Sequence, residues 1–316
     1  MTRIVNEAQL REAIGYDIAA LKQVEQGYRW LQERAISMPP VFHIDVDPQS
    51  AVDIKGAYVE GLDAFAIKMA SGFYANADKG IPSSSSVMLV ISSTTGFCEA
   101  VFLDNGYLMN LRTALAGAVA ADHLAKQEVA TVGIVGTGVQ ARAQLQALTL
   151  VRDFERVLVW GRDAEKAVLC ASDIGQYTNA EVMAHENLPT IARQSDILVT
   201  TTQSSDPLIQ PEWIVAGTHI TAMGSDLPRK QELTATLLQK ADRIVCDSVA
   251  QCRIGGELQH VPEGTLSGAA VELSSVICGQ DVGRTSDADI TICDMTGLGV
   301  LDTAISVAAL ARLANG

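Results

Sequence analysis

The 316-residue chain has few basic residues, few aromatic residues and no long apolar run. It holds 23 Lys and Arg against 37 Asp and Glu, a formal net charge of −14. A surface that acidic repels phosphate backbones, so we expect no binding to nucleic acid. No run of about 18 apolar residues occurs, which predicts no transmembrane helix and no membrane partner. Residues 1–7 lack the apolar region of a signal peptide, so we expect a cytoplasmic protein.

Several signatures of other chemistries are also missing. The five histidines show no HxxxH or HExxH spacing, so we expect no metal site. There is no GxSxG elbow of the kind that carries a serine nucleophile. The six cysteines include no CxxC pair and lie mostly in apolar runs, which predicts reduced core thiols.

The sequence does contain enough apolar material for two folded domains, since 48% of its residues are hydrophobic. Apolar spacing predicts a helix over 8–35, with Leu10, Ile14, Ile18, Leu21, Val24 and Tyr28 on its buried face and an end at Met38-Pro39-Pro40. Strand-like runs follow at 53–59, 64–69, 87–92 and 98–103. Their short connections favour an antiparallel meander, because a parallel crossover needs a dozen or more residues.

From about Thr113 the pattern changes to alternating helices and strands. A helix over 114–125 is followed by helices from Val139 and Ala164, near 188–192 and over 302–313. The expected strands lie at 130–135, 156–160, 180–183, 197–201, 219–223, 243–247 and 289–293. This spacing predicts an α/β fold with a Rossmann-type doubly wound parallel sheet.

A glycine-rich turn follows the first of these strands. Residues 136–141 read Gly136-Thr-Gly138-Val139-Gln140-Ala141, a GxGxxA motif between a strand and a helix. Gly136 allows the tight turn, Gly138 lets the backbone approach a pyrophosphate, and Ala141 permits close packing of helix on strand. The motif in this context predicts a dinucleotide site.

The end of the second strand bears on which dinucleotide is bound. It reads Gly161-Arg162-Asp163, where a cofactor with a free ribose 2′-hydroxyl calls for an acidic residue. Arg162 is suited to a 2′-phosphate, which favours NADP over NAD. Arg162 is alternatively a solvated residue at the start of a helix.

The loop after the strand 219–223 carries Asp226. Ligands of open parallel sheets bind beyond the carboxyl ends of the strands, so this carboxylate can act as a proton carrier. The local pattern equally suits a cap for a helix that begins near Pro228.

Two cationic residues stand in apolar surroundings. Lys68 lies in the run Ala64-Phe-Ala-Ile-Lys68, and Arg112 begins an Ala-rich helix. A buried cation needs a partner. Lys68 and Arg112 either clamp a substrate carboxylate or form internal salt bridges with an acidic residue such as Asp104.

Taken together, several segments resemble the ornithine cyclodeaminase/mu-crystallin family. They run in family order over nearly the whole chain, and residues 59–73 and 289–304 are especially similar to the ectoine-utilisation branch. The segments are Phe65–Lys68, Asp104–Ala114, Gly133–Ala141, Met223–Leu233 and Asp289–Asp302.

The resemblance implies an architecture and a set of site residues. It implies a substrate-binding and dimerisation domain over 1–112 and 300–316, a Rossmann domain over 113–299, and a homodimer. It assigns the substrate carboxylate to Lys68 and Arg112, and acid/base chemistry to Asp226 with Lys68 beside it. The expected cofactor contacts are Thr113, Gly136, Gly138, Val139, Gln140, Ala141, Arg162, Thr201, Met223 and Ser225.

The chain departs from the family pattern at two places. After Met38-Pro39-Pro40 the family commonly has a basic residue for the carboxylate, whereas this chain has Val41-Phe42-His43-Ile44, so His43 is the expected substitute. The Ser83–Ser86 run replaces more varied polar residues.

The function that follows is an NAD(P)H-dependent reductase of a small 2-imino acid, reversible as an amino-acid dehydrogenase. One alternative is a cyclodeaminase-type lyase that uses bound NAD catalytically and releases ammonia. An alternative of another class is an NADP-binding protein with little turnover.

Overall fold

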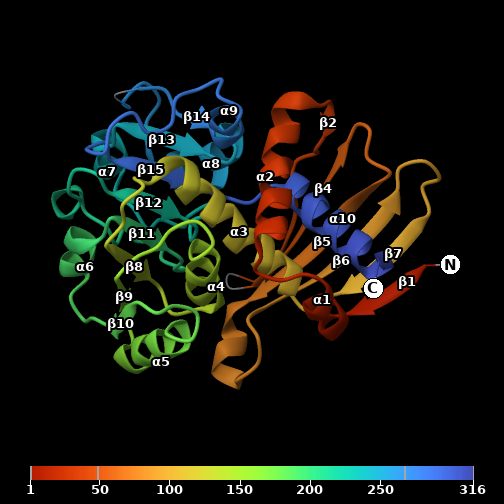
Figure 1. Cartoon of the computed structure of the whole chain (residues 1–316), viewed down its shortest axis with the longest axis horizontal. Helices are drawn as coiled ribbons and strands as arrows, with labels where there is room; N and C mark the ends of the chain where they lie inside the picture. Colours follow the sequence, from red (N-terminus) through yellow and green to blue (C-terminus); the bar gives the residue numbers. More distant parts are fainter. Residues whose placement is uncertain (1, 48–49, 267, 316) are drawn as a thin grey trace. The chain divides into compact units, whose positions relative to one another are not determined.

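The computed structural model describes residues 2–47, 50–266 and 268–315. The chain, coloured by residue number in Figure 1, divides into two units. The first unit joins Met1–Arg112 to Leu298–Gly316, and the second is Thr113–Gly297. Helix α3 (Tyr107–Leu124) therefore begins in the first unit and ends in the second.

The first unit is built on a sheet whose centre is the predicted meander. Strands β4 (Ser50–Val59), β5 (Ala64–Phe73), β6 (Ser84–Ser92) and β7 (Cys98–Leu103) pair antiparallel in sequence order, which confirms the prediction. Three outer strands were not predicted. They are β1 (Arg3–Asn6), β2 (Ile36–Ser37) and β3 (Phe42–Asp47). Strands β1 and β2 are very short, whereas β3 alternates apolar and polar residues and carries a strand signal that the prediction missed.

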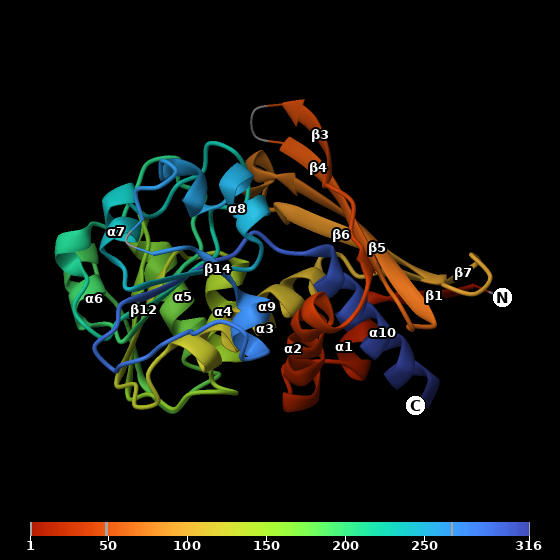
Figure 2. The ribbon, with the colours of Figure 1, turned by 90° about the horizontal axis from the view of Figure 1, so that it is seen from above.

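The prediction of one helix over 8–35 is wrong, because two helices occupy that stretch. Helix α1 (Glu7–Ala13) ends before Ile14, and α2 (Ile18–Glu33) restarts where the Asp17 carboxylate accepts the N–H of Ala20. Ile18, expected on the buried face, is exposed because it is the first residue of α2. Figure 2 shows α1, α2 and α10 (Gly299–Asn315) on one side of the sheet.

The second unit has an eight-stranded sheet whose pairings are all parallel, as predicted. Its order is β10-β9-β8-β11-β12-β15-β13-β14, with helices on both faces. The strands are β8 (Thr131–Val135), β9 (Arg156–Trp160), β10 (Glu181–Ala184), β11 (Ile197–Thr200), β12 (His219–Ala222), β13 (Arg243–Cys246), β14 (Val271–Glu272) and β15 (Thr291–Asp294). The helices are α4 (Val139–Leu148), α5 (Ala164–Ile174), α6 (Leu188–Gln194), α7 (Ala235–Lys240), α8 (Val249–Gly255) and α9 (Leu273–Ile277).

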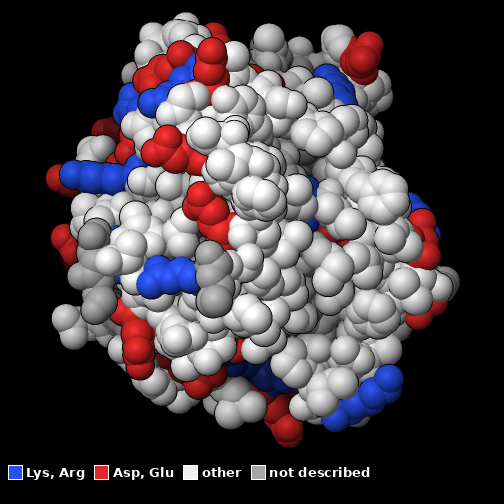
Figure 3. All heavy atoms as spheres, turned by 90° about the vertical axis from the view of Figure 1, so that its right-hand side faces the viewer, with Lys and Arg blue, Asp and Glu red and all other residues white. Residues whose placement is uncertain are grey.

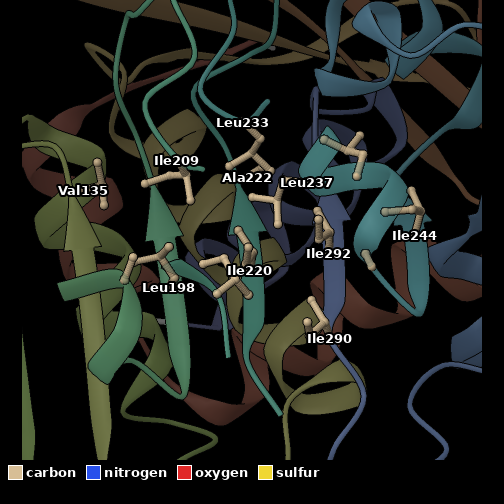
Figure 4. Close-up of a cluster of buried hydrophobic side chains, with 14 of the residues drawn as sticks. Val135, Leu198, Ile209, Ile220, Ala222, Leu233, Leu237, Ile244, Ile290 and Ile292 are labelled. Atoms are coloured by element: carbon tan, nitrogen blue, oxygen red, sulfur yellow. The ribbon is translucent and has the colours of Figure 1, made fainter. Parts of the chain in front are cut away.

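The strands of this sheet are apolar along their length because they are covered on both faces. Figure 4 shows one such face, where Leu198, Ile220 and Ile292 from neighbouring strands meet Leu233 and Leu237. This core fixes the strand ends, and the loops of the candidate site follow them. Within the described residues, no helix combines the length and the apolar character that a membrane crossing requires.

Candidate active site

The glycine turn after β8 has a shape that requires glycine at its first position. Gly136 has a φ of +124°, a backbone conformation that residues other than glycine rarely adopt. A Cβ there would also lie 2.4 Å from the Thr201 Oγ1 atom. Thr201 is tied to the end of β8, because its N–H and its hydroxyl both donate to the Val135 carbonyl. Gly136 and Thr201, both predicted to contact the cofactor, are therefore neighbours.

The start of α4 leaves room and hydrogen-bond donors for an anion. Gly138 is its N-cap and supplies no side-chain hydrogen bond, so the first N–H groups of this ten-residue helix are not capped by a side chain. A Cβ on Gly138 would meet no atom within 4 Å, so the space beside the turn is open. Ala141 is fully buried, whereas Val139 is exposed. These residues fit the pyrophosphate of a dinucleotide.

Two further predicted cofactor contacts are joined through one glutamine. The buried Gln144 side chain donates from Nε2 to the Thr113 carbonyl (3.1 Å) and to the Gln140 Oε1 atom (3.3 Å). The start of the second unit is thereby fixed to the first turn of α4.

At the end of β9, Gly161 leaves no space for a side chain, because a Cβ would lie 2.5 Å from the Thr137 Cγ2 atom. The Asp163 carboxylate caps α5 by accepting the N–H groups of Glu165 and Lys166. Arg162 is exposed and makes no hydrogen bond or ion pair with any residue that the structure describes. Asp163 is therefore used as a helix cap, whereas the Arg162 side chain has no partner among the described residues.

Asp226 lies in a loop and does not cap a helix. The expectation of a helix near Pro228 is wrong, because the next helix, α7, begins at Ala235. The Asp226 Oδ1 atom lies 2.5 Å from the Lys230 Nζ atom, and the Asp226 side chain is 46% exposed. The carboxylate is thus held by one cation and remains accessible.

The loop that carries Asp226 is anchored through its neighbours. The Ser225 hydroxyl contacts the carbonyl oxygens of Lys230 (2.9 Å) and Gly255 (3.2 Å). The Met223 N–H donates to the Thr200 carbonyl at the end of β11.

Glu232, which sequence reasoning missed, connects this loop to the loop after β11. Its buried carboxylate accepts hydrogen bonds from the Thr200 hydroxyl (2.5 Å), the Thr202 N–H (2.5 Å) and the Gly224 N–H (2.9 Å). Burial raises the Glu232 pKa. Nothing in the local sequence marks this residue, because its partners come from two other loops.

Two more buried carboxylates continue the same arrangement. Glu257 accepts the N–H groups of Glu232 (2.8 Å) and Leu233 (3.0 Å). Asp294, at the end of β15, accepts those of Glu257 (3.0 Å) and Leu258 (2.9 Å). Burial raises the pKa of Glu257 well above its usual range and that of Asp294 to about 7. The loops at the carboxyl ends of three strands are therefore linked through Glu232, Glu257 and Asp294, which we call the carboxylate chain.

In the first unit, Lys68 and Arg112 converge on Asp302 from α10. The Lys68 Nζ atom lies 2.9 Å from Asp302 Oδ2 and 3.1 Å from Oδ1, and Arg112 Nε donates to Oδ1 at 2.8 Å. All three side chains are at least nine-tenths buried. We call them the basic triad. The prediction that Asp104 pairs with these cations is wrong, because the Asp104 carboxylate accepts hydrogen bonds from the Ser86 hydroxyl and the Leu108 N–H instead.

The triad leaves hydrogen-bond donors unused. Arg112 binds Asp302 through Nε alone, and its two terminal amino groups make no hydrogen bond within the described part of the chain. Burial, and then the charge of Arg112, lowers the Lys68 pKa to about 7. Burial opposes ionisation of Asp302, yet the charges of Arg112 and Lys68 outweigh it and lower the Asp302 pKa.

His43 lies outside the triad, on the exposed strand β3. Its Nδ1 atom is 2.6 Å from Asp53 Oδ1 and its Nε2 atom is 3.0 Å from Asp45 Oδ1, and these contacts raise its pKa. With both ring nitrogens bound to carboxylates, its contact with substrate stays a prediction.

The described residues also contain one group of potential metal ligands that the sequence did not reveal: Cys246, Cys252 and Asp294. Both Asp294 oxygens already accept backbone N–H groups. All six cysteines are free, and four of them are buried.

A parallel doubly wound sheet with an open glycine turn is the architecture of dinucleotide-binding proteins. The model of the ornithine cyclodeaminase/mu-crystallin family matches residues 1–313, so the chain belongs to this family. Its relatives are NAD(P)-dependent oxidoreductases or cyclodeaminases of amino and imino acids, and the chain is an enzyme of this kind.

Three comparisons illustrate the relationship. An uncharacterised cyclodeaminase of Sinorhizobium fredii is 43% identical over 98% of this chain and 95% of its own. An archaeal alanine dehydrogenase, solved as a dimer with bound NAD, is 30% identical with a TM-score of 0.90, covering 99% and 96% of the two chains. The Thermococcus litoralis Δ1-pyrroline-2-carboxylate reductase, solved with NADH and L-proline, is 26% identical with a TM-score of 0.92 over 99% and 98%.

Proposed function

We propose that the chain is an NAD(P)H-dependent reductase of a small 2-imino acid and, in reverse, an amino-acid dehydrogenase. The observation that carries this proposal is the buried guanidinium of Arg112, whose two terminal amino groups are not used by the described residues. A largely buried guanidinium with unused donors is well suited to bind an anionic ligand.

A carboxylate is the ligand that suits these donors. Asp302 fixes the guanidinium through Nε, so the outer edge of Arg112 presents two parallel donors to a substrate carboxylate. Lys68, held on the same Asp302, adds a second cationic contact. Fixing the carboxylate holds the 2-carbon in one orientation, and such positioning supplies much of an enzyme's rate enhancement.

The proton is assigned to Asp226. When bound, the nicotinamide supplies or accepts the hydride. Asp226 donates a proton toward the imine nitrogen in reduction and accepts one from the ammonium group in oxidation. Lys230 orients the carboxylate through its contact at 2.5 Å.

The cofactor is assigned to the glycine turn and to the loops that follow β11 and β12. Thr113, Gln140, Thr201, Met223 and Ser225 are the proposed contacts besides the turn itself. Arg162 favours NADP, because its guanidinium is exposed and uncommitted while Asp163 caps α5. The solved relatives described above bind NAD or NADH, so NAD is the alternative.

We also propose a homodimer formed through the outer sheet face of the first unit. This is the side of the sheet that faces away from α1, α2 and α10. Figure 3 shows an outer face of the molecule on which uncharged residues predominate. Monomers rarely expose so many large apolar side chains in one area. Those of the outer sheet face are Ile4, Phe42, Ile44, Tyr58, Met69, Leu89 and Leu103.

Asp226→Asn tests the proton assignment. Loss of a general acid/base should lower kcat by about 10²- to 10⁴-fold with cofactor affinity retained. Asp153→Asn, an exposed residue before β9, is the matched control and should retain activity. Unchanged turnover in Asp226→Asn would refute the assignment.

The cyclodeaminase reaction is the second candidate, favoured by the 43% identical relative that bears this name. Parallel measurements of nicotinamide absorbance and of ammonia concentration distinguish the reductase from the cyclodeaminase. The reductase consumes NAD(P)H when given a 2-oxo acid and ammonia. A cyclodeaminase releases ammonia from a diamino acid with no net change in cofactor absorbance.

A further inference from the structure

The glycine turn after β8 is bound by a side chain that lies just outside the GxGxxA motif. Arg142, at the end of the first turn of α4, donates from Nη1 to the carbonyl oxygens of Thr137 (2.7 Å) and Gly138 (3.2 Å). Thr137 and Gly138 belong to the segment that connects β8 to α4. One guanidinium group therefore contacts two successive peptide groups of the turn.

These two hydrogen bonds set the direction of two backbone N–H groups. In a trans peptide the C=O and the N–H lie in one plane and point in opposite directions, and the described residues contain no cis peptide. The Thr137 carbonyl shares its peptide group with the Gly138 N–H, and the Gly138 carbonyl shares its peptide group with the Val139 N–H. Because both carbonyl groups point toward Arg142, both N–H groups point away from it.

The two N–H groups are available to a ligand. Neither Gly138 nor Val139 donates a backbone hydrogen bond to any residue that the structure describes. The space next to Gly138 is open, since a Cβ built there would meet no atom within 4 Å. The side of the turn that faces away from Arg142 therefore offers two free donors.

Arg142 is itself held in place by Asp173 of α5. The Arg142 Nε atom donates to the Asp173 Oδ2 atom at 2.7 Å, and the Nη2 atom lies 2.7 Å from the same oxygen. The guanidinium is thus bound by a carboxylate along one edge and by the turn at Nη1. Because Asp173 neutralises the positive charge, Arg142 acts on the turn mainly by fixing its direction.

We propose that Arg142 is a positioning residue of the cofactor site, which directs the N–H groups of Gly138 and Val139 toward the pyrophosphate, and that Asp173 holds Arg142 in the orientation that this requires. The inference rests on the proposed function, which assigns the cofactor to the glycine turn. Arg142 itself does not touch the cofactor in this arrangement.

The turn needs such a contact because of its glycines. A glycine backbone adopts many conformations, so the peptide groups on either side of Gly138 are free to rotate when nothing holds their carbonyl groups. Ordering them when the cofactor binds would reduce the affinity, whereas a turn that is ordered beforehand avoids this loss.

Cofactor binding to the wild-type protein and to Arg142→Met provides the test. Fluorescence titration gives the Kd of NADH or NADPH, whichever the wild type binds more tightly, and calorimetry gives the Kd of ADP-ribose. Arg142→Met should raise both Kd values by about ten-fold, because a hydrogen bond from a charged group contributes roughly one to two powers of ten. An equal loss for ADP-ribose assigns the effect to the half of the cofactor that contains the pyrophosphate.

Arg156→Met is the matched control. The Arg156 guanidinium donates to the Thr131 hydroxyl where β8 and β9 begin, at the end of these strands opposite to the turn. This variant loses the same charge from the same sheet and should leave both Kd values unchanged. Unchanged Kd values in Arg142→Met, or the same loss in both variants, would overturn the inference.

Asp173→Asn distinguishes positioning from attraction by charge. If Asp173 holds Arg142 in place, the variant should weaken binding of ADP-ribose several-fold. If Arg142 instead attracts the pyrophosphate by its charge, removal of the neighbouring negative charge should strengthen binding. Stronger or unchanged binding in Asp173→Asn therefore overturns the inference.

The same measurements separate this inference from the proposed function. A wild-type protein that binds neither nicotinamide cofactor nor ADP-ribose would refute the cofactor assignment, and the inference with it. If the wild type binds them, both variants weaken binding, and no imino acid is reduced, the reductase function is wrong and the role of Arg142 stands.

Discussion

The two units of this protein bury carboxylates in opposite ways. Asp302 in the first unit is neutralised by two cations. Asp294 in the second unit is held by two backbone N–H groups. The pKa of Asp302 is lowered by the charges of Arg112 and Lys68 despite burial, whereas burial raises that of Asp294. Neighbouring charge, and not burial alone, decides the protonation state.

The same comparison distinguishes a group whose hydrogen bonds are all used within the protein from one that keeps unused donors. In the carboxylate chain, each member is satisfied by N–H or hydroxyl groups of loops that it ties together. In the basic triad, donors outnumber acceptors, because Arg112 keeps two amino groups that no described residue binds. These unused donors of Arg112 are the ones to which we assign the substrate carboxylate.

The largest expected effect comes from Asp302→Asn. The variant leaves two buried cations without a counter-charge, so the free energy of unfolding should fall by about 3–5 kcal/mol. Urea denaturation monitored by circular dichroism measures this loss. Asp17→Asn is the control, because it weakens the more exposed pair with Arg312 while asparagine still caps α2, and it should cost less than about 1 kcal/mol. Equal losses in the two variants would contradict the comparison.

A smaller effect, of opposite sign in the two units, is expected in the pH dependence of stability. Because the Asp294 pKa is raised from 3.8 to about 7, the folded state binds more protons than the unfolded state between these values. The contribution of Asp294 to the free energy of unfolding is complete below pH 3.8 and is lost as the pH rises to about 7. The pKa of Lys68 is instead lowered from 10.5 to about 7, so the folded state binds fewer protons than the unfolded state between these values. The contribution of Lys68 to stability therefore increases as the pH rises from about 7 to 10.5.

Asp294→Asn checks the acidic part of this profile. Urea unfolding at several pH values should show a shallower decline in stability in the variant than in the wild type. Glu257, whose pKa is also raised, keeps some of the decline in place. A slope identical to that of the wild type would mean that Asp294 is ionised throughout.

The smallest effect is expected at an exposed cation. Arg162→Ser should lower the preference for NADPH over NADH by about ten-fold, because the contact to a 2′-phosphate is screened by solvent. The ratio of kcat/KM values for the two cofactors measures it, and the effect should weaken with added salt. Arg193→Ser, an exposed residue near the end of α6, is the control. An unchanged ratio would remove Arg162 from the cofactor site.

Much of the fold could be predicted because its signals are local. The central strands of the first unit and seven of the eight parallel strands of the second follow from apolar runs and turns, whereas the two-residue β14 was missed. Gly136 follows from a motif six residues long. The helix break at Ile14–Asp17 was missed because the apolar spacing continues through it, and only the caps at Asn6 and Asp17 mark separate helices. The helix expected at Pro228 failed because tertiary contacts of Ser225 and Glu232 hold that segment as a loop.

By itself, the sequence determined the alternation of elements, the glycine turn and the presence of two cations in apolar surroundings. Only the tertiary structure decided which groups meet those cations, since Asp302 lies 190 residues from Arg112 along the chain. The physical reason is that a charge in the interior is satisfied by whatever folding brings beside it. That choice depends on the packing of α10 against the sheet and has no counterpart in local sequence.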